Sequence, residues 1–179
     1  MTIRLSKCAL VAAIAFYYSL VVFNNLIDYE TNHQFVVHIL SMDSIFPGSH
    51  QLWRSIPSAQ MQILFYLAII AWELAAAVLC WWGAARLFSK LHKPAQDFEA
   101  AKPMAVAGLT LGCLLWLVAF LSIGGEWFLM WQTKTWNGQE AAFRMFAISG
   151  IVLIYLVMPE ARSEPTKADQ PGGGNDGKT

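Results

Sequence analysis

The stretch "LFYLAIIAWELAAAVLCWW", residues 64–82, decides the fold, because it is an almost unbroken apolar run with one carboxylate, Glu73, near its middle. A helix of about 20 apolar residues crosses the bilayer core, where every backbone polar group has to be hydrogen-bonded within the protein. The apolar run continues on both sides, from about residue 62 to residue 87. It therefore predicts a membrane-spanning helix that contains a buried acid.

Three other stretches have the same character, and they cover residues 5–27, 104–123 and 141–158. Of the 179 residues, 56% are apolar and 13% are charged, which is far from the average of soluble domains. We expect an all-α membrane protein whose residues 1–158 form an antiparallel bundle of four transmembrane helices. Residues 159–179 lack the apolar side chains that would offset the entropy of ordering, so they predict a disordered tail.

Lysines and arginines lie mainly on one side of these spans, and basic side chains favour the cytoplasmic side of a membrane. The two connecting segments on the other side contain only Arg54 and Lys134. We therefore expect both termini in the cytoplasm and the bilayer as the main surrounding. The twelve basic and twelve acidic residues cancel, so nothing indicates a field that attracts nucleic acid. The basic residues on the expected cytoplasmic side are Arg4, Lys7, Arg86, Lys90, Lys93, Lys102, Arg162 and Lys167.

The loop between the second and third spans reads "SKLHKPAQDFEAAKP", residues 89–103. It is polar and contains prolines, and its lysines stand where anionic headgroups would attract them. We interpret this loop as solvated interface rather than as a specific site.

The first outer connection contains "TNHQFVVHILSMD", which begins at Thr31. Thr31 as N-cap with Gln34 three residues later predicts a short helix that ends at about Met42. Apolar side chains cover most of its surface, and Gln34, His38 and Ser41 form a narrow polar stripe. A helix of this kind is typical of the membrane interface.

The second outer connection contains "GGEWFLMWQTKTWNG", residues 124–138, with three tryptophans near the end of the third span. Tryptophan favours the boundary between lipid and water, because its ring is apolar and its N–H needs a polar partner. We interpret these side chains as interface anchors. Asn137 followed by Glu140 predicts a reciprocal cap at the start of the fourth span.

Arg144 lies about one turn inside the fourth span, where an unpaired guanidinium is costly unless it snorkels or meets a carboxylate. Glu126 and Glu140 are expected at the same level. One interpretation is a structural pair or triad that locks the outer ends of the third and fourth spans. The other interpretation is a ligand or partner site. The first predicts that removing both acids is worse for stability than removing the arginine, because it strands a partly buried charge.

Glu73 is the sharpest candidate for a functional residue. Ionised near the bilayer midplane without a partner, it would cost several kcal/mol, so it should face the bundle interior. Three interpretations remain open: an interhelical hydrogen-bond clamp, a proton relay or transport site, and a pair with a cation of another subunit. Its expected neighbours by depth are Tyr17, Tyr18, Ser19 and Ser149.

Histidines and acids of the outer segments have the chemistry to bind a metal. His33 and His38 are five residues apart and lie on different faces of a helix, which argues against a shared ion. We expect no metal and no cofactor, and the sequence contains no nucleophile, phosphate-loop or dinucleotide motif. The alternative is an outer-face metal or enzyme site made of His38, Asp43, His50 and Glu126.

Three motifs carry a resemblance to a known family: "NNLIDYETNHQFVVHILSMD", "AWELAAAVL" and "GGEWFLMWQTKTWNGQEAAFR". With these motifs the chain resembles an uncharacterised group of predicted small integral membrane proteins of bacteria, a domain of unknown function. The resemblance covers about residues 1–158. It implies four spans and a bacterial inner membrane, and it implies no reaction.

We therefore expect a non-enzymatic accessory, assembly or interaction subunit of a membrane complex. Its partner is either a second copy or another membrane subunit, toward which the aromatic outer end and Glu73 face. The first alternative is a small proton-linked carrier that uses Glu73. The second alternative is the outer-face metal or enzyme site.

Overall fold

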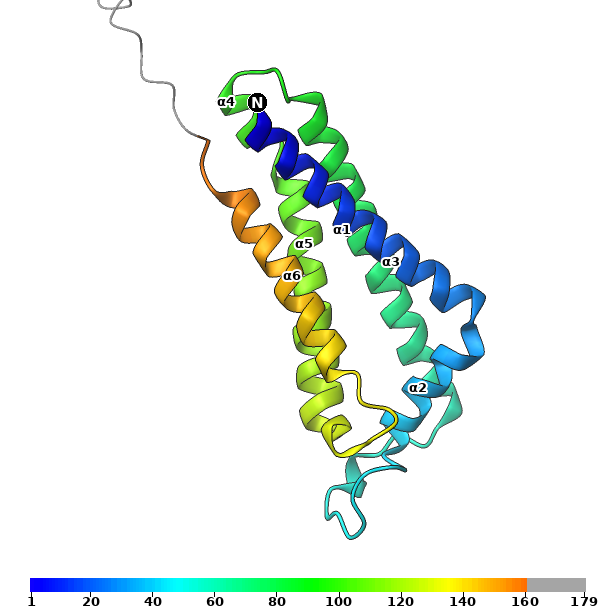
Figure 1. Ribbon diagram of the computed structural model, residues 1–179. Helices are drawn as coiled ribbons and strands as arrows, with labels where there is room; N and C mark the ends of the chain where they lie inside the picture. Colours follow the sequence, from blue (N-terminus) through cyan, green and yellow to red (C-terminus); the bar gives the residue numbers. More distant parts are fainter. Residues whose placement is uncertain (161–179) are drawn as a thin grey trace, which may run out of the picture.

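The computed structural model describes residues 1–160, and in that part of the chain all regular structure is helical. Four of its helices are long and apolar enough to cross a membrane (Figure 1). The predicted all-α class and the four apolar spans are therefore confirmed. The predicted tail from residue 161 onward lies outside the described residues. The four helices are α1 (Thr2–Ile27), α3 (Ala59–Ser89), the third span Pro103–Trp127, and α6 (Gln139–Val157).

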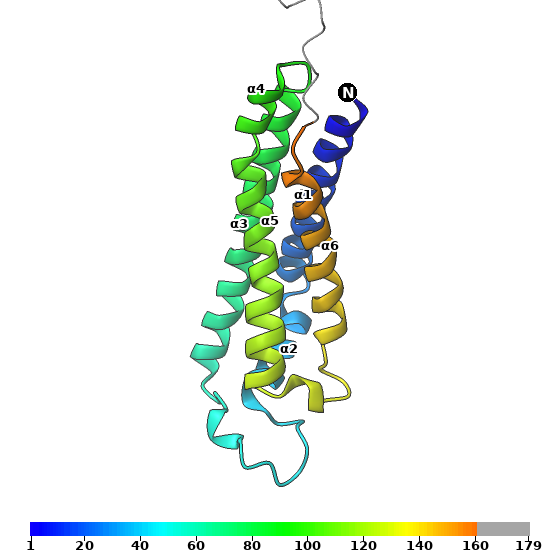
Figure 2. The same ribbon diagram turned by 90° about the vertical axis from the view of Figure 1, so that its left-hand side faces the viewer.

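The bundle has two ends, which are distinguished by the short helices α4 and α2. Figures 1 and 2 show the short helix α4 beside the start of α1 and the end of α6, and we call this the terminal end. Helix α2 lies at the opposite end, which we call the loop end. Consecutive long helices thus run in opposite directions. The remaining elements are α2 (Tyr29–Ser41), η1 (Leu52–Arg54), α4 (Ala95–Ala100), α5 (Pro103–Leu114), η2 (Leu115–Trp127) and η3 (Met130–Gln132).

Helix α3 packs closely against α1 and α5, and the α3–α5 contact depends on glycine. A Cβ atom added to Gly108 would lie 2.7 Å from the backbone nitrogen of Cys80. A Cβ atom on Gly83 would meet the backbone of Ala105 still more closely. Helices in lipid gain little from the hydrophobic effect, so small residues that allow close backbone approach hold them together. Only glycine fits at these two positions.

Buried aromatic side chains add hydrogen bonds between helices. The indole N–H of Trp116 donates to the hydroxyl of Tyr18 at 2.8 Å. The indole N–H of Trp72 donates to the backbone carbonyl of Leu111 at 3.0 Å. These bonds satisfy polar groups inside the bundle, where water is absent.

The loop-side half of the third span, η2, is π-helical. The backbone N–H of Phe128 donates to the carbonyl of Ile123 at 2.9 Å, five residues back along the chain. Long π-helical segments are rare, and short ones often occur at functional sites. Whereas α5 packs closely on α3, η2 touches α3 little. The two helices therefore separate toward the loop end.

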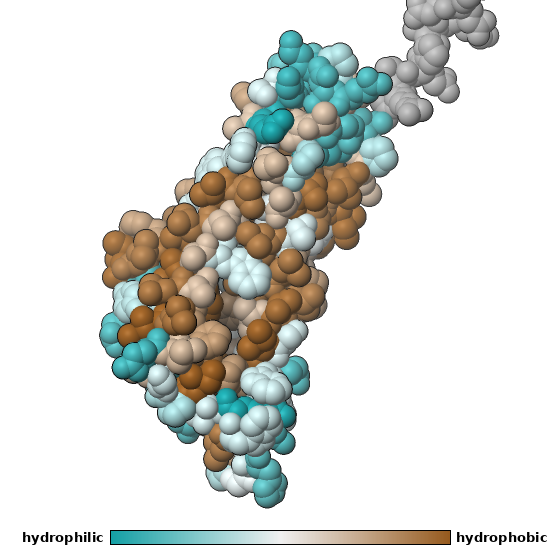
Figure 3. Space-filling view, turned by 180° about the vertical axis from the view of Figure 1, so that it is seen from behind, coloured by the Kyte–Doolittle hydropathy of each residue, from teal (hydrophilic) through white to brown (hydrophobic). Residues whose placement is uncertain are grey.

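The outer surface of the bundle is apolar along its middle. Figure 3 shows a brown band between two teal ends. Large apolar side chains on all four long helices are exposed there, among them Phe16, Leu64, Leu117 and Ile151. A continuous apolar surface of this size marks contact with a membrane.

Helix α2 and the start of α6 differ in detail from the predicted caps. α2 confirms the predicted short helix, but it begins at Tyr29, before Thr31, and no side chain of the described residues caps it. The reason is that α2 follows α1 almost directly. At α6, the Oδ1 of Asn137 accepts a hydrogen bond from the backbone N–H of Gln139 at 3.1 Å, but Glu140 returns none within the described chain. The place of α2 at the membrane interface stays a prediction.

We expect Gly108→Ala to destabilise the protein by about 1 to 3 kcal/mol, because the new methyl group overpacks the α3–α5 contact. The matched control is Gly150→Ala, since a Cβ at this helical glycine meets nothing within 4 Å. This control should be neutral or should stabilise by up to about 1 kcal/mol, because alanine is the better helix former. Thermal unfolding in detergent measures both, and equal melting temperatures would contradict the packing argument.

Candidate functional site

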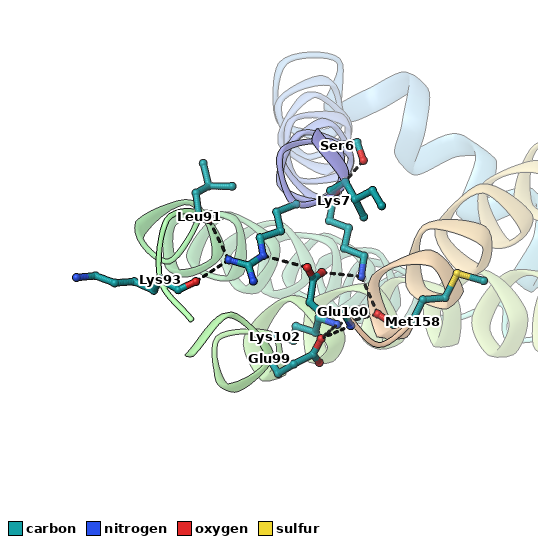
Figure 4. Close-up of polar contacts among 10 residues, drawn as sticks. Ser6, Lys7, Leu91, Lys93, Glu99, Lys102, Met158 and Glu160 are labelled. Atoms are coloured by element: carbon teal, nitrogen blue, oxygen red, sulfur yellow. Dashed lines mark hydrogen bonds and ion pairs between the residues drawn. The ribbon is translucent and has the colours of Figure 1, made fainter. Parts of the chain in front are cut away.

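Polar side chains from distant parts of the chain meet at the terminal end, as Figure 4 shows. Glu160 joins two of them: its Oε2 lies 2.9 Å from Nε of Arg4, and its Oε1 lies 3.3 Å from Nζ of Lys7. The Nζ of Lys102 donates to Oε1 of Glu99 at 2.7 Å, and the backbone N–H of Glu160 donates to the same oxygen at 3.1 Å. We call these five residues the terminal cluster.

The terminal cluster holds the end of α6. Nζ of Lys7 and Nζ of Lys102 donate to the carbonyl oxygen of Met158 at 2.7 and 3.1 Å. The last carbonyls of a helix lack partners within the helix and carry partial negative charge, which two ammonium groups satisfy. The Lys7 side chain is only 1% exposed, so its charge depends on these contacts. The cluster thus ties α6 to α1 and to the start of α5.

Arg4 also fixes the connection between α3 and α5. Its Nη1 donates to the backbone carbonyls of Leu91 and Lys93 at 3.1 and 2.6 Å. Its guanidinium carbon lies 5.0 Å from the ring centre of Phe98, which is fully buried. The interpretation of this loop as solvated interface holds for its exposed residues, such as Lys93 and Asp97, but not for Leu91 and Phe98, which are buried. The apolar residues between its lysines pack against the start of α1.

Two residues of the terminal cluster, Glu160 and Lys102, have shifted pKa values. Burial alone would raise the pKa of Glu160, but hydrogen bonds from Arg4 and Lys7 and their charges outweigh burial and lower this pKa. Burial lowers the pKa of Lys102, and the hydrogen bond to Glu99 opposes that shift. The arrangement is that of a structural lock, since its cations and carboxylates bind each other.

The sequence interpretation missed the terminal cluster. Arg4 and Glu160 are 156 residues apart, and Glu160 falls in the segment that was predicted to be a disordered tail. The available signal was the excess of basic residues before the first span, with one acid directly after the last span.

Glu73 is 2% exposed and is bound by a residue that depth alone did not indicate. The side-chain amide of Asn25 donates to Oε2 of Glu73 at 2.7 Å. The hydroxyl of Tyr66 donates to the backbone carbonyl of Asn25 at 2.8 Å. Because Asn25 is two residues from the end of α1, Glu73 lies level with the loop-side end of α1 rather than with its middle. This geometry fits an interhelical clamp.

None of the four predicted neighbours forms a hydrogen bond with Glu73 among the described residues. The hydroxyl of Tyr18 is bound by Trp116, and Ser19 Oγ accepts a hydrogen bond from the indole of Trp81 at 3.0 Å. Ser149 Oγ is buried and has no hydrogen-bond partner in the described part of the chain. Tyr17 is close enough to interact with the charge of Glu73, but the hydrogen bond comes from Asn25, because the register between α1 and α3 brings the end of α1 opposite Glu73.

Glu126, Glu140 and Arg144 do not form the predicted triad. All three residues are exposed, and within residues 1–160 no ion pair or hydrogen bond joins them. The face of α6 that packs on the bundle contains Ala142 and Ser149, whereas Arg144 lies on another side of α6, close enough to Tyr17 of α1 for its charge to act there. The structural interpretation of this corner is therefore wrong.

His38 pairs with Asp43 at the loop end, with 2.7 Å between Nδ1 and Oδ2. Its ring stacks on Trp136 at a centroid distance of 4.3 Å. Among the described residues, no three His, Cys, Asp or Glu side chains lie together in a way that could hold a metal. The alternative set with His50 and Glu126 is thus not assembled. Of the four residues in this set, only His38 and Asp43 pair with each other. The Asp43 carboxylate orients the imidazole ring through Nδ1.

Comparison with known families gives one match over most of the chain. The family described as predicted small integral membrane protein (DUF2165) matches residues 3–159. Comparisons with curated proteins and with solved structures found no match.

The lowered pKa of Glu160 predicts a specific loss of stability in acid. A carboxyl whose folded pKa lies below its ordinary value near 4.5 stabilises the fold above that pH and loses this contribution as the pH falls through the folded pKa. Unfolding of the wild type in detergent should therefore become easier below pH 4.5, and Glu160→Gln should reduce that slope. Glu126→Gln, at an exposed acid outside the terminal cluster, serves as control and should leave the slope unchanged.

Because Glu126, Glu140 and Arg144 are apart within one chain, their effects on the stability of a monomer should add. We expect Arg144→Leu and the double change Glu126→Gln with Glu140→Gln to combine within about 0.5 kcal/mol in the triple variant. Thermal unfolding in a detergent that keeps the protein monomeric measures this sum. If Arg144→Leu raised the melting temperature of the double variant, the result would contradict additivity and support the triad interpretation.

Proposed function

We propose that this chain, which belongs to the family described as predicted small integral membrane protein (DUF2165), serves as a non-enzymatic interaction subunit of a membrane complex. Arg144 carries the proposal. It lies in the second turn of α6, a helix long and apolar enough to cross a membrane, and its side chain is exposed. The charge is thus exposed within an expected span, on a side of α6 that is near Tyr17 of α1.

An exposed guanidinium at this depth needs a partner. Facing lipid without one is costly, and either snorkelling or a nearby carboxylate lowers that cost. Neither Glu126 nor Glu140 of the same chain reaches it within the described residues. A carboxylate from a neighbouring subunit would stabilise the charge and would fix the orientation of the two proteins.

A second copy of the chain supplies such a carboxylate. A two-fold contact between copies is self-complementary, so the arginine of each copy can meet an acid of the other. Glu140 is one turn from Arg144 on the same helix and is exposed as well. In this arrangement each copy contributes one Arg144 and one Glu140, and all four charges are paired.

Glu73 takes no part in this surface, since it is buried and bound by Asn25. That contact supports a clamp inside one chain rather than the expected role toward a partner. It also gives less support to the alternative of a proton-linked carrier, because Asn25 has no titratable group to pass a proton onward. The absence of a catalytic motif in the sequence supports a role other than that of an enzyme.

We place the protein in the bacterial inner membrane with both termini in the cytoplasm. The basic residues at the terminal end support this orientation, because positive charge favours the cytoplasmic side. The outer connections, with Arg54 and Lys134 as their only basic residues, then face away from the cytoplasm.

Purification in mild detergent tests the proposal. The wild type should elute as a dimer, and Arg144→Gln should weaken dimerisation by about tenfold or more, as expected when one partner of a paired charge is removed. Arg86→Gln is the matched control, since Arg86 is an exposed arginine near the other end of the bundle. The charge reversal Arg144→Glu with Glu140→Arg should restore the dimer.

Two results would count against the proposal. A wild type that is strictly monomeric and co-purifies with no other membrane protein would remove its basis. Equal dimerisation of Arg144→Gln and Arg86→Gln would show that Arg144 is not at the contact.

A further inference from the structure

An apolar cavity of about 230 Å³ lies at the loop-side half of the bundle, between α2, α3 and η2. All of its lining residues are apolar. Figure 3 shows a face on which the brown band is hollowed toward the loop end. Representative lining residues are Val36 and Leu40 of α2, Ala68 and Trp72 of α3, and Phe120 and Ile123 of η2.

The cavity exists because α3 packs closely on one half of the third span and loosely on the other half. Glycine holds α3 against α5, but the π-helical η2 touches α3 little. α2 covers part of the resulting space with Val36 and Leu40, which are buried. Phe65 of α3 and Ile123 of η2 line the cavity and are also 37% and 43% exposed, so the space opens on the outer surface of the spans. In a membrane this opening faces lipid.

The volume is sufficient for a segment of a hydrocarbon chain. An apolar protein cavity of about 150 Å³ stays free of water and binds benzene. Here the cavity is larger and opens toward lipid tails. An acyl chain can therefore enter from the side without crossing a polar surface.

Arg54 stands at the loop-side edge of the cavity. Its Nη1 donates to the backbone carbonyl of Trp127 at 3.3 Å, and the next residue, Phe128, lines the cavity. The guanidinium carbon lies 4.7 Å from the ring centre of Trp127 and 5.4 Å from that of Trp53. Two tryptophans thus hold a cation at the level where aromatic side chains mark the edge of the bilayer.

The donors of Arg54 are not used up by the protein. Its Nε is buried and has no hydrogen-bond partner among the described residues, and no acid in residues 1–160 forms an ion pair with it. A buried donor without an acceptor is costly, and a guanidinium fits phosphate oxygens with two parallel bonds. An anionic group on the accessible side of the guanidinium would pair with its charge.

We propose that the cavity and Arg54 together form a binding site for an anionic phospholipid, with one acyl chain in the cavity and the phosphate group on Arg54. Two features of one ligand, an apolar chain and an anionic head, match two adjacent features of the protein. Neither feature involves Arg144, so this site is independent of the dimer contact proposed above.

Lipid retention measured by native mass spectrometry tests the site. The full chain is extracted from vesicles that contain equal amounts of phosphatidylglycerol and phosphatidylcholine with identical acyl chains. The wild type should retain the anionic lipid about tenfold better, the ratio expected for a hydrogen bond to a charged group. Arg54→Gln should bring the ratio close to one, and Arg86→Gln, the matched control, should leave it unchanged.

The chain-binding part is tested separately. Ala68→Trp places a large side chain in the cavity and should abolish retention of both lipids. Ala75→Trp, at an exposed position of α3 outside the cavity lining, should not affect retention, and thermal unfolding of each variant verifies that it is folded. Equal retention of the two lipids by the wild type, a preference that survives Arg54→Gln, or identical behaviour of the two tryptophan variants would overturn the proposal.

Discussion

The close approach of α3 to α5 is the constraint on which the rest of the structure depends. In lipid the hydrophobic effect does not bring helices together, so their arrangement follows from where backbones can touch. Gly83 and Gly108 provide these places, and a side chain at either would meet backbone atoms of the facing helix. With this pair fixed, α1 packs on α3 and α6 packs on α5.

The same constraint explains the loop-side half of the molecule. α3 and the third span are close where glycine lines their contact and separate where η2 becomes π-helical. At the terminal end polar groups are satisfied within the protein, as in the pair of Arg4 and Glu160. On the separated side an apolar cavity remains, with Arg54 at its edge. Close packing and the proposed lipid site thus occupy opposite halves of one helix pair.

Arginines in three settings show how environment decides the role of one residue type. Arg4 is bound by Glu160 and by two backbone carbonyls, so its charge stabilises the fold. Arg54 is stacked on tryptophans, and its Nε has no hydrogen-bond acceptor among the described residues. Arg144 is exposed and has no ion-pair partner among the described residues. A cation bound within the chain serves structure, whereas one that the chain leaves without an acceptor is available to a ligand or to another subunit.

The sequence by itself determined the class of the protein, its four spans within a few residues, and the short helix after α1, because the length of an apolar run and the period of its side chains are local properties. Only the tertiary structure decided which polar residues meet. The partners of Glu73 and of Glu160 depend on helix register and on contacts up to 156 residues apart. The triad around Arg144 does not form, because among the described residues neither Glu126 nor Glu140 comes within ion-pair distance of the guanidinium. Hydropathy fixes the depth of a residue in a span, but the close packing of small residues fixes the direction in which it points.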